Sequence, residues 1–469
     1  MYNTKIKTVR AAAFILISFS IIPSGFSLDF DRGAGGFKAA LAASDTPRVS
    51  APAPVSDRNN NKIQGVKEWT VLVYVNGKND LERAGLYNLN KMELVGSGDK
   101  LNIVTEIGRM NGQNGDTAGD GNWTGSRRYF VTKDRNEEKI KSDRLQSFGK
   151  VDMGDWRHLV DFAKWGMANY PARHYMLIVW NHGSGWLTTK DLPVNKGISY
   201  DFETKNHIST PELGAAMREI GKVDILAYDA CLMQMAELLY EVNGYADYVV
   251  GSEETVPGMG FPYDTILKSF TGSKNSGELA AEMVSAYDGF YATRNQKTTL
   301  SAVRMSALGG FMTAFNAWTE ALLASDKKTD IHAKAYLAGS YAASDNKDLY
   351  DFVRLAAAVD PQGPVGEKGR ALMAALSGEL IINNLAYKKG RVSDTASHGL
   401  AIYLPHLRNN YNPKYDQLAW ARDTRWDEYL KEMAGPTEIL GCAVPAPDAS
   451  YQVTLAFIAC LEAANKPKP

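Results

Sequence analysis

One cysteine and one histidine lie where a nucleophile and a proton-transfer group could work together. Cys231 follows the apolar run at 223–228, and His182 follows the apolar run at 175–180. A thiolate attacks carbonyl carbon readily, and an imidazole can accept or donate the proton that such a reaction moves. The two residues together predict nucleophilic catalysis by a cysteine–histidine dyad, with no third member visible in the sequence.

The elements that must position these residues are two strands. Both apolar runs are short and continuous, as expected of buried strands in a parallel sheet. Ligand chemistry in such sheets gathers beyond the carboxyl ends of the strands, so neighbouring strands would place His182 and Cys231 in one crevice. Residues 233–242 repeat apolar side chains at helical spacing, which predicts a helix directly after the cysteine. The N-terminus of that helix would favour the thiolate.

Each residue alone has an ordinary structural explanation. A cysteine after a buried strand is usually packing, and a single histidine is usually a hydrogen-bonded structural residue. The combination points to a site, because His182 is also followed by glycines that let a substrate approach the backbone.

Residues around the pair have predicted roles in binding. The backbone N–H groups of Gly183 and Cys231 are the natural donors to an oxyanion. Asp229 lies two residues before the cysteine, so strand alternation points both side chains the same way and favours a cationic substrate group. The alternative is that Asp229 caps the following helix. Glu253 and Glu254, after the next strand, are predicted to add negative charge to this pocket.

Three motifs contain these residues, namely Asn-His-Gly-Ser-Gly-Trp at 181–186, Asp-Ala-Cys-Leu-Met at 229–233 and Gly-Ser-Glu-Glu-Thr-Val-Pro-Gly-Met-Gly-Phe-Pro-Tyr at 251–263. They resemble motifs of the clostripain family of cysteine peptidases, relatives of caspases, legumain and gingipains. Further similar stretches lie at 69–82, 198–201, 209–213 and 399–405. The resemblance implies an α/β fold, a caspase-like three-layer α/β/α sandwich with a mostly parallel central sheet and a helical C-terminal elaboration.

The resemblance also implies a specificity. In clostripain-like enzymes the aspartate that matches Asp229 lines the pocket that selects Arg or Lys on the acyl side of the cut. Met259 departs from the family pattern, because this position is often acidic there, and the departure weakens the expectation of strict selectivity.

The loop at 187–197 is polar, contains a proline and offers lysines to a pocket with Asp229. We expect the enzyme to mature by cutting itself after Lys196, with Lys190 as the second choice. The resemblance agrees, since clostripain-like enzymes are processed between histidine and cysteine and their two pieces stay associated. A cut by another protease is the alternative.

Acidic residues in the loop at 109–128 do not have the spacing of a calcium-binding loop. Asp116, Asp120 and Asn122 could supply oxygens, but the dense alternation of such ligands is missing. We predict no metal site and no required cofactor, with Ca²⁺ as an activator that the resemblance suggests.

The charge balance and the N-terminal residues indicate which partners and which cellular compartment to expect. The 469 residues hold 52 Lys and Arg against 53 Asp and Glu, which gives no electrostatic reason for a nucleic-acid or membrane partner. Basic residues and the apolar run at 11–22 predict a signal peptide cleaved after Ser27, hence a secreted or periplasmic protein. Protein or peptide substrates, and a monomer or self-cleaved two-chain form, are expected. Cys442 and Cys460 could pair in such a compartment, or all three cysteines could be thiols.

The chain divides into five predicted segments. They are a signal peptide at 1–27, a linker or propeptide at 28–66, a caspase-like catalytic core at 67–300, the C-terminal part of the peptidase fold at 301–435 and a tail at 436–469. The C-terminal part is predicted to contain helices at 308–325 and 367–384.

Other functions compete with an endopeptidase. A serine hydrolase built on Ser184 lacks the G-x-S-x-G turn between strand and helix. A cysteine amidohydrolase acting on a small amide, and a non-catalytic exported binding protein that retains the fold, remain open alternatives.

Overall fold

The protein is described from a computed structural model, which covers residues 66–186, 197–388, 397–405 and 411–434, the short strand segments 55–56, 392–393, 438–439 and 442–443, and positions 456 and 459. Within these residues the chain forms an 11-stranded sheet. In spatial order its strands are Val55–Ser56 (β1), Asp143–Phe148 (β5), Gly125–Phe130 (β4), Leu101–Arg109 (β3), Lys67–Gly77 (β2), Ala172–Trp180 (β6), Val223–Asp229 (β9), Ala246–Gly251 (β10), Thr298–Arg304 (β11), Ile381–Lys388 (β13) and Val392–Ser393 (β14).

The centre of this sheet is parallel and its flanks are antiparallel. β2 pairs in parallel with β3 and β6, and β9 pairs in parallel with β6 and β10. On one flank β3 pairs antiparallel with β4, and on the other β10 pairs antiparallel with β11. The carboxyl ends of β2, β6 and β9 therefore meet at one edge, as the apolar character of these strands predicts.

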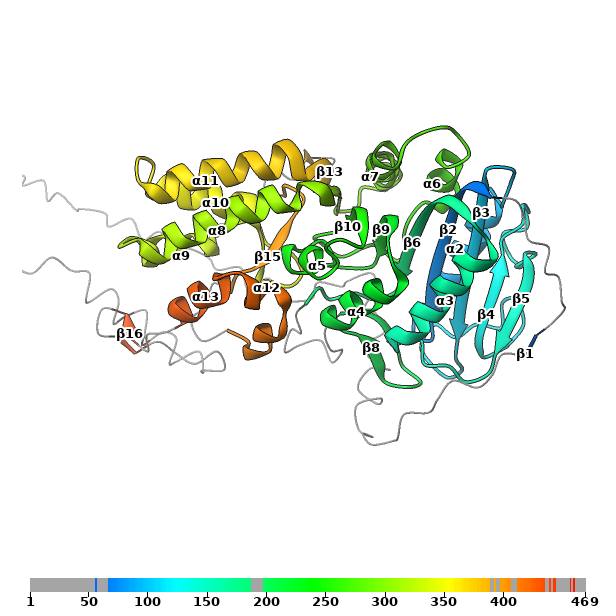
Figure 1. Ribbon diagram of the computed structural model, residues 1–469. Coiled ribbons are helices and arrows are strands. Elements are labelled where there is room, and N and C mark those ends of the chain that lie inside the picture. Colours follow the sequence, from blue (N-terminus) through cyan, green and yellow to red (C-terminus); the bar gives the residue numbers. More distant parts are fainter. Residues whose placement is uncertain are drawn as a thin grey trace, which may run out of the picture.

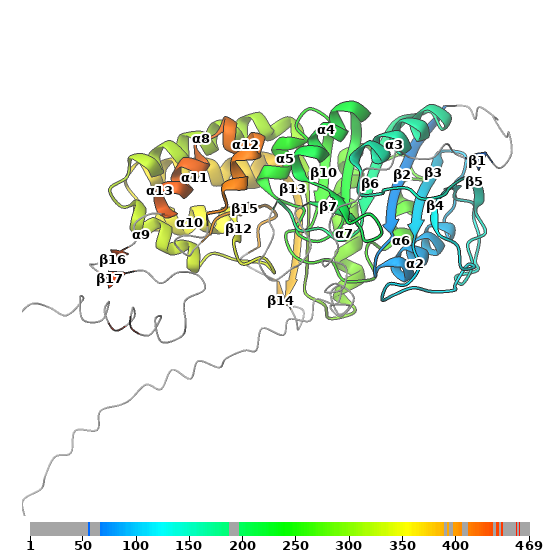
Figure 2. The same ribbon diagram turned by 90° about the horizontal axis from the view of Figure 1, so that it is seen from below.

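Helices cover both faces of the sheet. Figure 2 shows α3 (Trp156–Asn169), α4 (Thr210–Ile220) and α5 (Ala236–Glu241) on one face. The opposite face carries α2 (Glu82–Glu93), α6 (Tyr263–Ser269) and α7 (Ser276–Ala292). The predicted three-layer α/β/α sandwich is thus confirmed.

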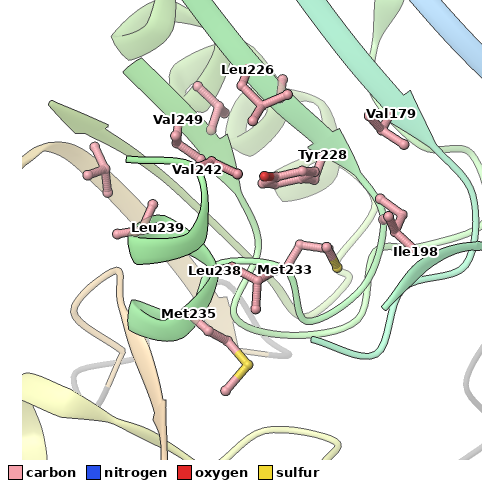
Figure 3. Close-up of a cluster of buried hydrophobic side chains, with 14 of the residues drawn as sticks. Val179, Ile198, Leu226, Tyr228, Met233, Met235, Leu238, Leu239, Val242 and Val249 are labelled. Atoms are coloured by element: carbon pink, nitrogen blue, oxygen red, sulfur yellow. The ribbon is translucent and has the colours of Figure 1, made fainter. Parts of the chain in front are cut away.

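The layers hold together through buried apolar side chains close to the functional edge. Figure 3 shows Leu226 of β9, Leu238 and Leu239 of α5 and Val249 of β10 in one cluster, and all four are fully buried. Burial of each such side chain contributes about 1.5–3 kcal/mol to folding. The strand that leads to Cys231 is therefore fixed by packing against α5 and beside β10.

The C-terminal part forms a group of helices beside the sheet (Figure 1), where the rings of Trp318 and Trp426 stack with centroids 6.0 Å apart. Its helices are α8 (Leu308–Ala324), α9 (Lys328–His332), α10 (Leu349–Val359), α11 (Pro364–Ala375), α12 (Ala419–Asp423) and α13 (Trp426–Ala434).

The strands outside the main sheet form two-stranded sheets. They are β7 (Ile198–Asp201) with β8 (Asn206–Ile208), β12 (Asn346–Asp348) with β15 (Ala401–Tyr403), and β16 (Glu438–Ile439) with β17 (Cys442–Ala443).

One predicted helix is wrong at its end. The helix expected over 367–384 stops as α11, passes through a π-helical turn at Leu376–Leu380 and continues as strand β13. Pairing with β11 explains the change, because Ile381 and its neighbours supply the ladder hydrogen bonds that β11 needs on its outer side. This strand also carries the sheet past the predicted boundary at residue 300.

Several predictions concern residues outside those described. They are the signal peptide at 1–27, most of the linker at 28–66, the lysines at 190 and 196, and the side chains of Cys442 and Cys460. Among the described residues, no helix has the length and apolar character that crossing a bilayer requires.

Candidate active site

Three adjacent parallel strands end in three polar side chains. Asp80 follows β2, His182 follows β6 and Cys231 follows β9, and these strands are neighbours in the order β2-β6-β9. Trp180 pairs with Asp229, so the histidine and the cysteine lie at the same level beyond the sheet edge. The structure thus brings together the two residues that the sequence singled out.

The Cys231 thiol is buried and receives a backbone N–H group. Val256 N donates to Sγ over 3.2 Å, and only 6% of the cysteine is exposed. A donor directed at sulfur stabilises the thiolate relative to the thiol. The next residue, Leu232, has a φ of 61°, an uncommon conformation for a leucine, which marks a tight turn directly after the nucleophile.

The helix after this turn begins later than predicted. α5 starts at Ala236, whereas the apolar spacing placed its start at residue 233. The N–H groups of Leu232 and Gln234 donate instead to the carbonyl oxygens of Glu254 and Ser252. Because these tertiary hydrogen bonds replace the first helical turn, the N–H group of Val256 takes the role that the helix N-terminus was expected to fill.

His182 is held by a carboxylate and by aromatic rings. Its Nε2 lies 2.7 Å from Oδ1 of Asp80, and its ring stacks on Phe202 with an interplanar angle of 3°. The preceding Asn181 accepts a hydrogen bond from Tyr200 N over 2.8 Å. The imidazole is therefore positioned from several sides, and one of them is the short strand β7.

Sequence reasoning missed Asp80, although a signal was present. Asp80 follows a buried strand and belongs to a stretch, 69–82, that resembles the clostripain family. The rule that located His182 and Cys231, polar residues just beyond the carboxyl ends of central strands, applies to Asp80 equally.

The backbone of Gly183 lies directly against the cysteine turn. A β-carbon on residue 183 would fall 2.4 Å from the carbonyl oxygen of Cys231 and 3.0 Å from Cβ of Ala230. Only glycine fits this approach. The next residue, Ser184, is engaged elsewhere, because its hydroxyl lies 2.8 Å from that of Tyr200 in a buried hydrogen bond.

The Asp229 carboxyl is buried, and one of its two oxygens accepts hydrogen bonds. Its Oδ2 accepts hydrogen bonds of 3.0 Å from Phe261 N and from Tyr263 Oη. Its Oδ1 has no hydrogen-bond partner among the described residues, and burial raises the pKa of this carboxyl to about 7. The alternative that Asp229 caps the following helix is wrong, because these bonds lead to the loop after β10.

Glu253 and Glu254 make contacts that differ from the expectation. Glu254 pairs with Lys297 Nζ at 2.6 Å, and Glu253 accepts a hydrogen bond from Gly399 N over 3.2 Å. Burial and the nearby Asp348 carboxylate raise the pKa of Glu253 well above its usual range. Both side chains thus contact the C-terminal half of the chain, and the charge of Glu254 acts on Tyr287 together with that of Asp229.

Met259 lies in the loop that follows β10. It is partly buried, and its carbonyl oxygen accepts a hydrogen bond of 2.9 Å from Asn88 Nδ2.

The carboxylates of the 109–128 loop accept hydrogen bonds from backbone N–H groups of the chain. Asp116 accepts a hydrogen bond from Gly112 N, and Asp120 accepts one from Ile140 N. In the described part of the chain, no group of three or more His, Cys, Asp or Glu side chains is placed to hold a metal ion.

Comparison with known proteins points to one family. The model of the clostripain family matches residues 73–433, a span that includes Asp80, His182 and Cys231. Clostripain from Hathewaya histolytica is 31% identical over 246 residues, which are 48% of this chain and 46% of that protein. The chain thus spans about half the length of this curated relative.

Two solved structures share the fold at lower identity. An inactive zymogen C11 protease from Parabacteroides distasonis has a TM-score of 0.59 at 20% identity, over 78% of this chain and 99% of that chain. A secreted C11 cysteine protease from Bacteroides thetaiotaomicron, in complex with an irreversible peptide inhibitor, has a TM-score of 0.58 at 19% identity, over 77% and 99%. These likenesses confirm the fold that the sequence predicts.

Proposed function

The chain belongs to the clostripain family of cysteine peptidases, and we propose that it is an exported endopeptidase that cleaves after Arg or Lys. The observation that carries this proposal is the meeting of His182 and Cys231 at neighbouring strand ends, with the Gly183 backbone packed against the cysteine turn. A nucleophile and a proton-transfer group in one crevice are what acyl transfer requires.

In the first step, the Cys231 thiolate attacks the carbonyl carbon of the scissile bond. The carbonyl π electrons move to oxygen, and the N–H groups of Gly183 and Cys231 donate to the resulting oxyanion. The oxyanion collapses, the C–N bond breaks, and His182 delivers a proton to the departing amine. The products of this step are an acyl-enzyme thioester on Cys231 and a free amine.

In the second step, His182 takes a proton from water as the water oxygen attacks the thioester. The C–S bond breaks and Cys231 is regenerated as a thiolate beside the protonated imidazole. Each proton moves through the histidine, so no further acid or base is needed. Ca²⁺ is proposed only as an activator, since every step is assigned to a residue of the chain.

Selectivity for basic residues would come from Asp229. Its Oδ1 is buried without a hydrogen-bond partner among the described residues, so a substrate ammonium or guanidinium would supply the donor that this oxygen lacks. Charge pairing would also lower the proton affinity that burial has raised. Glu254 is paired with Lys297, so the basic preference is assigned first to Asp229.

Self-processing between histidine and cysteine belongs to the same proposal. Ser184 N donates to Gly197 O over 3.0 Å, and Gly197 N donates to Ser184 Oγ over 3.2 Å, so the two flanks of the loop are tied together. A cut after Lys196 would make Gly197 the new N-terminal residue of the second piece, and Gly197 O would still accept the hydrogen bond from Ser184 N. The pieces would remain associated through β6 and β9.

The test compares hydrolysis of peptide reporters that differ in the residue before the cut, namely Arg, Lys, Asn, Asp or Leu. Wild type should cleave the Arg and Lys reporters, whereas Cys231→Ala and His182→Ala should lose turnover together, since they act as one unit. Ser184→Ala is the matched control and should retain it. Turnover near the wild-type rate in Cys231→Ala would refute the proposal, and loss in Ser184→Ala alone would favour a serine hydrolase.

Export is tested on the N-terminus of the purified protein. A mature chain that begins directly after Ser27 is expected, and an intact Met1 in protein recovered from outside the cytoplasm would contradict the signal-peptide assignment.

A further inference from the structure

The contact between Asp80 and His182 has a defined polarity. The two side chains are 9% and 10% exposed, and Oδ1 of the carboxylate lies 2.7 Å from Nε2. A carboxylate only accepts hydrogen bonds, so Nε2 must carry the proton. In the neutral ring the other nitrogen, Nδ1, is then the basic one, and it is the nitrogen that must exchange protons with sulfur and substrate.

Asp80 is fixed by the residues on its N-terminal side. Lys78 is fully buried and pairs with Asp201 Oδ2 at 3.0 Å and with Glu203 at 2.6 Å. Asn79 Nδ2 donates to Tyr200 O over 2.7 Å. The turn after β2 is thereby attached to β7, the same strand whose neighbouring rings pack on His182.

A second support lies on the C-terminal side. Glu82 Oε1 pairs with Arg109 Nη2 at 2.9 Å, and both side chains are buried. Glu82 also accepts hydrogen bonds from Gln113 Nε2 and Thr117 N, which fold the loop after β3 back over the turn. Gly115 in this loop has a φ of 118°, and a β-carbon there would fall 2.3 Å from the carbonyl oxygen of Asp80.

We propose that Asp80 is a positioning residue of the proposed peptidase: it holds the His182 ring with Nδ1 toward the reaction and stabilises the imidazolium that forms when the histidine takes a proton. The β2 turn and the loop at 110–124 keep the carboxylate in place. The inference rests on the proposed function, because it assigns Asp80 a role through the catalytic histidine.

Two consequences follow for the chemistry. A carboxylate beside the ring favours the thiolate–imidazolium pair over the neutral pair, so Cys231 stays reactive to lower pH. The same charge stabilises the imidazolium formed in hydrolysis of the thioester, which lowers the barrier without changing substrate binding. Loss of Asp80 should therefore affect the rate of chemistry and leave the Michaelis constant almost unchanged.

The experiment compares Asp80→Asn with Asp224→Asn in the full chain. Asp224 is the matched control, because its Oδ1 contacts His174 at the same distance of 2.7 Å, but at the opposite end of β9 from the cysteine. Iodoacetamide labelling is followed on the peptide that contains Cys231, so that labelling of Cys442 and Cys460 does not interfere. The midpoint of its pH profile is measured together with kcat and KM for a Lys reporter.

In Asp80→Asn the labelling midpoint should move up by about 1 pH unit or more, and kcat should fall by ~100-fold or more with KM within ~3-fold. Asp224→Asn should match wild type in all three. A wild-type profile and kcat in Asp80→Asn, with Cys231→Ala inactive, would overturn the role of Asp80 and leave the proposed function standing. Full activity in Cys231→Ala would overturn both.

A measurement on Cys231→Ala avoids dependence on how Asp80→Asn folds. Nitrogen-15 NMR of the histidine rings, with His182 assigned from its absence in a His182→Ala double variant, reports which ring nitrogen carries the proton when the ring is neutral. A proton on Nε2 of His182 supports the proposal, and a proton on Nδ1 overturns it.

Discussion

The backbone of Gly183 lies so close to Cys231 that a β-carbon on residue 183 would fall 2.4 Å from the cysteine carbonyl oxygen. The two motifs that the sequence offered separately are therefore in direct contact through main chain. This contact fixes the distance between the proposed oxyanion donors, Gly183 N and Cys231 N, because both belong to the touching segments.

Gly183→Ala should lower kcat/KM for a Lys reporter by ~100-fold or more, since the methyl group must push the two turns apart and misplace an oxyanion donor. The matched control is Gly149→Ala, where nothing lies within 4 Å of the added carbon. Reporter assays on folded protein of both variants provide the measurement. Equal activity of Gly183→Ala and wild type would contradict the packing of these turns.

Asp229→Asn should reduce cleavage of Lys and Arg reporters far more than cleavage of a Leu reporter, because an unpaired cation is costly to bury. Glu254→Gln is the comparison, since its carboxylate is already paired with Lys297 and should change the ratio of Lys to Leu cleavage by less than ~3-fold. The ratio of kcat/KM values is the measurement. If Glu254→Gln lowers the ratio of Lys to Leu cleavage more than Asp229→Asn does, then Glu254 rather than Asp229 is the residue that selects basic substrates.

Asp229 should also make the folded protein less stable as pH rises. Burial raises its pKa from 3.8 to about 7, so between these values the folded state holds a proton that the unfolded chain has released. The free energy of unfolding therefore falls through this window and stays lower above it. Asp229→Asn removes the effect, and it should be more stable than wild type at pH 8 by an amount on the order of a few kcal/mol.

Denaturant unfolding of Asp229→Asn and wild type from pH 4 to pH 8 measures this difference. The difference in free energy of unfolding between Asp229→Asn and wild type should shrink toward zero near pH 4. At that pH the Asp229 carboxyl of the folded wild type is protonated and therefore neutral, like the asparagine side chain. A variant that is less stable than wild type at pH 8 would mean that the carboxylate is stabilised by its surroundings.

The positions of the catalytic candidates could be predicted from sequence because strand ends in parallel sheets obey a topological rule. The apolar runs before His182 and Cys231 define two central strands, and the chain between them is long enough for one crossover. Asp80 obeys the same rule, which places it at the same sheet edge as His182, but the rule does not predict which polar side chains of that turn form hydrogen bonds with the histidine.

The errors have a common physical cause, namely tertiary hydrogen bonds that local patterns do not encode. The turn after Cys231 bonds to the loop after β10 and delays α5, although the apolar spacing from residue 233 is helical. For Glu253 and Glu254, the position after a central strand predicts added charge near Asp229, but it does not predict which residues these side chains contact. Their partners, Gly399 and Lys297, lie far along the chain and could not be anticipated.

Self-processing predicts two fragments that join at Lys196–Gly197. Intact mass spectrometry should show them in wild type and in Lys190→Gln, whereas Cys231→Ala should stay whole and Lys196→Gln should be cut slowly or at another lysine. Identical fragments in wild type and Cys231→Ala would assign the cut to another protease. Mixing wild type with Cys231→Ala then distinguishes cutting within one molecule from cutting between molecules.

The central claim is that Cys231 attacks substrates with a basic residue before the cut, and covalent capture tests it most directly. A peptidyl chloromethyl ketone with Lys at its reactive end should form one adduct, on the peptide containing Cys231, at least ~100-fold faster than its Leu counterpart and ~100-fold faster than in His182→Ala. An adduct confined to another residue, or equal rates for the Lys and Leu reagents, would contradict the account.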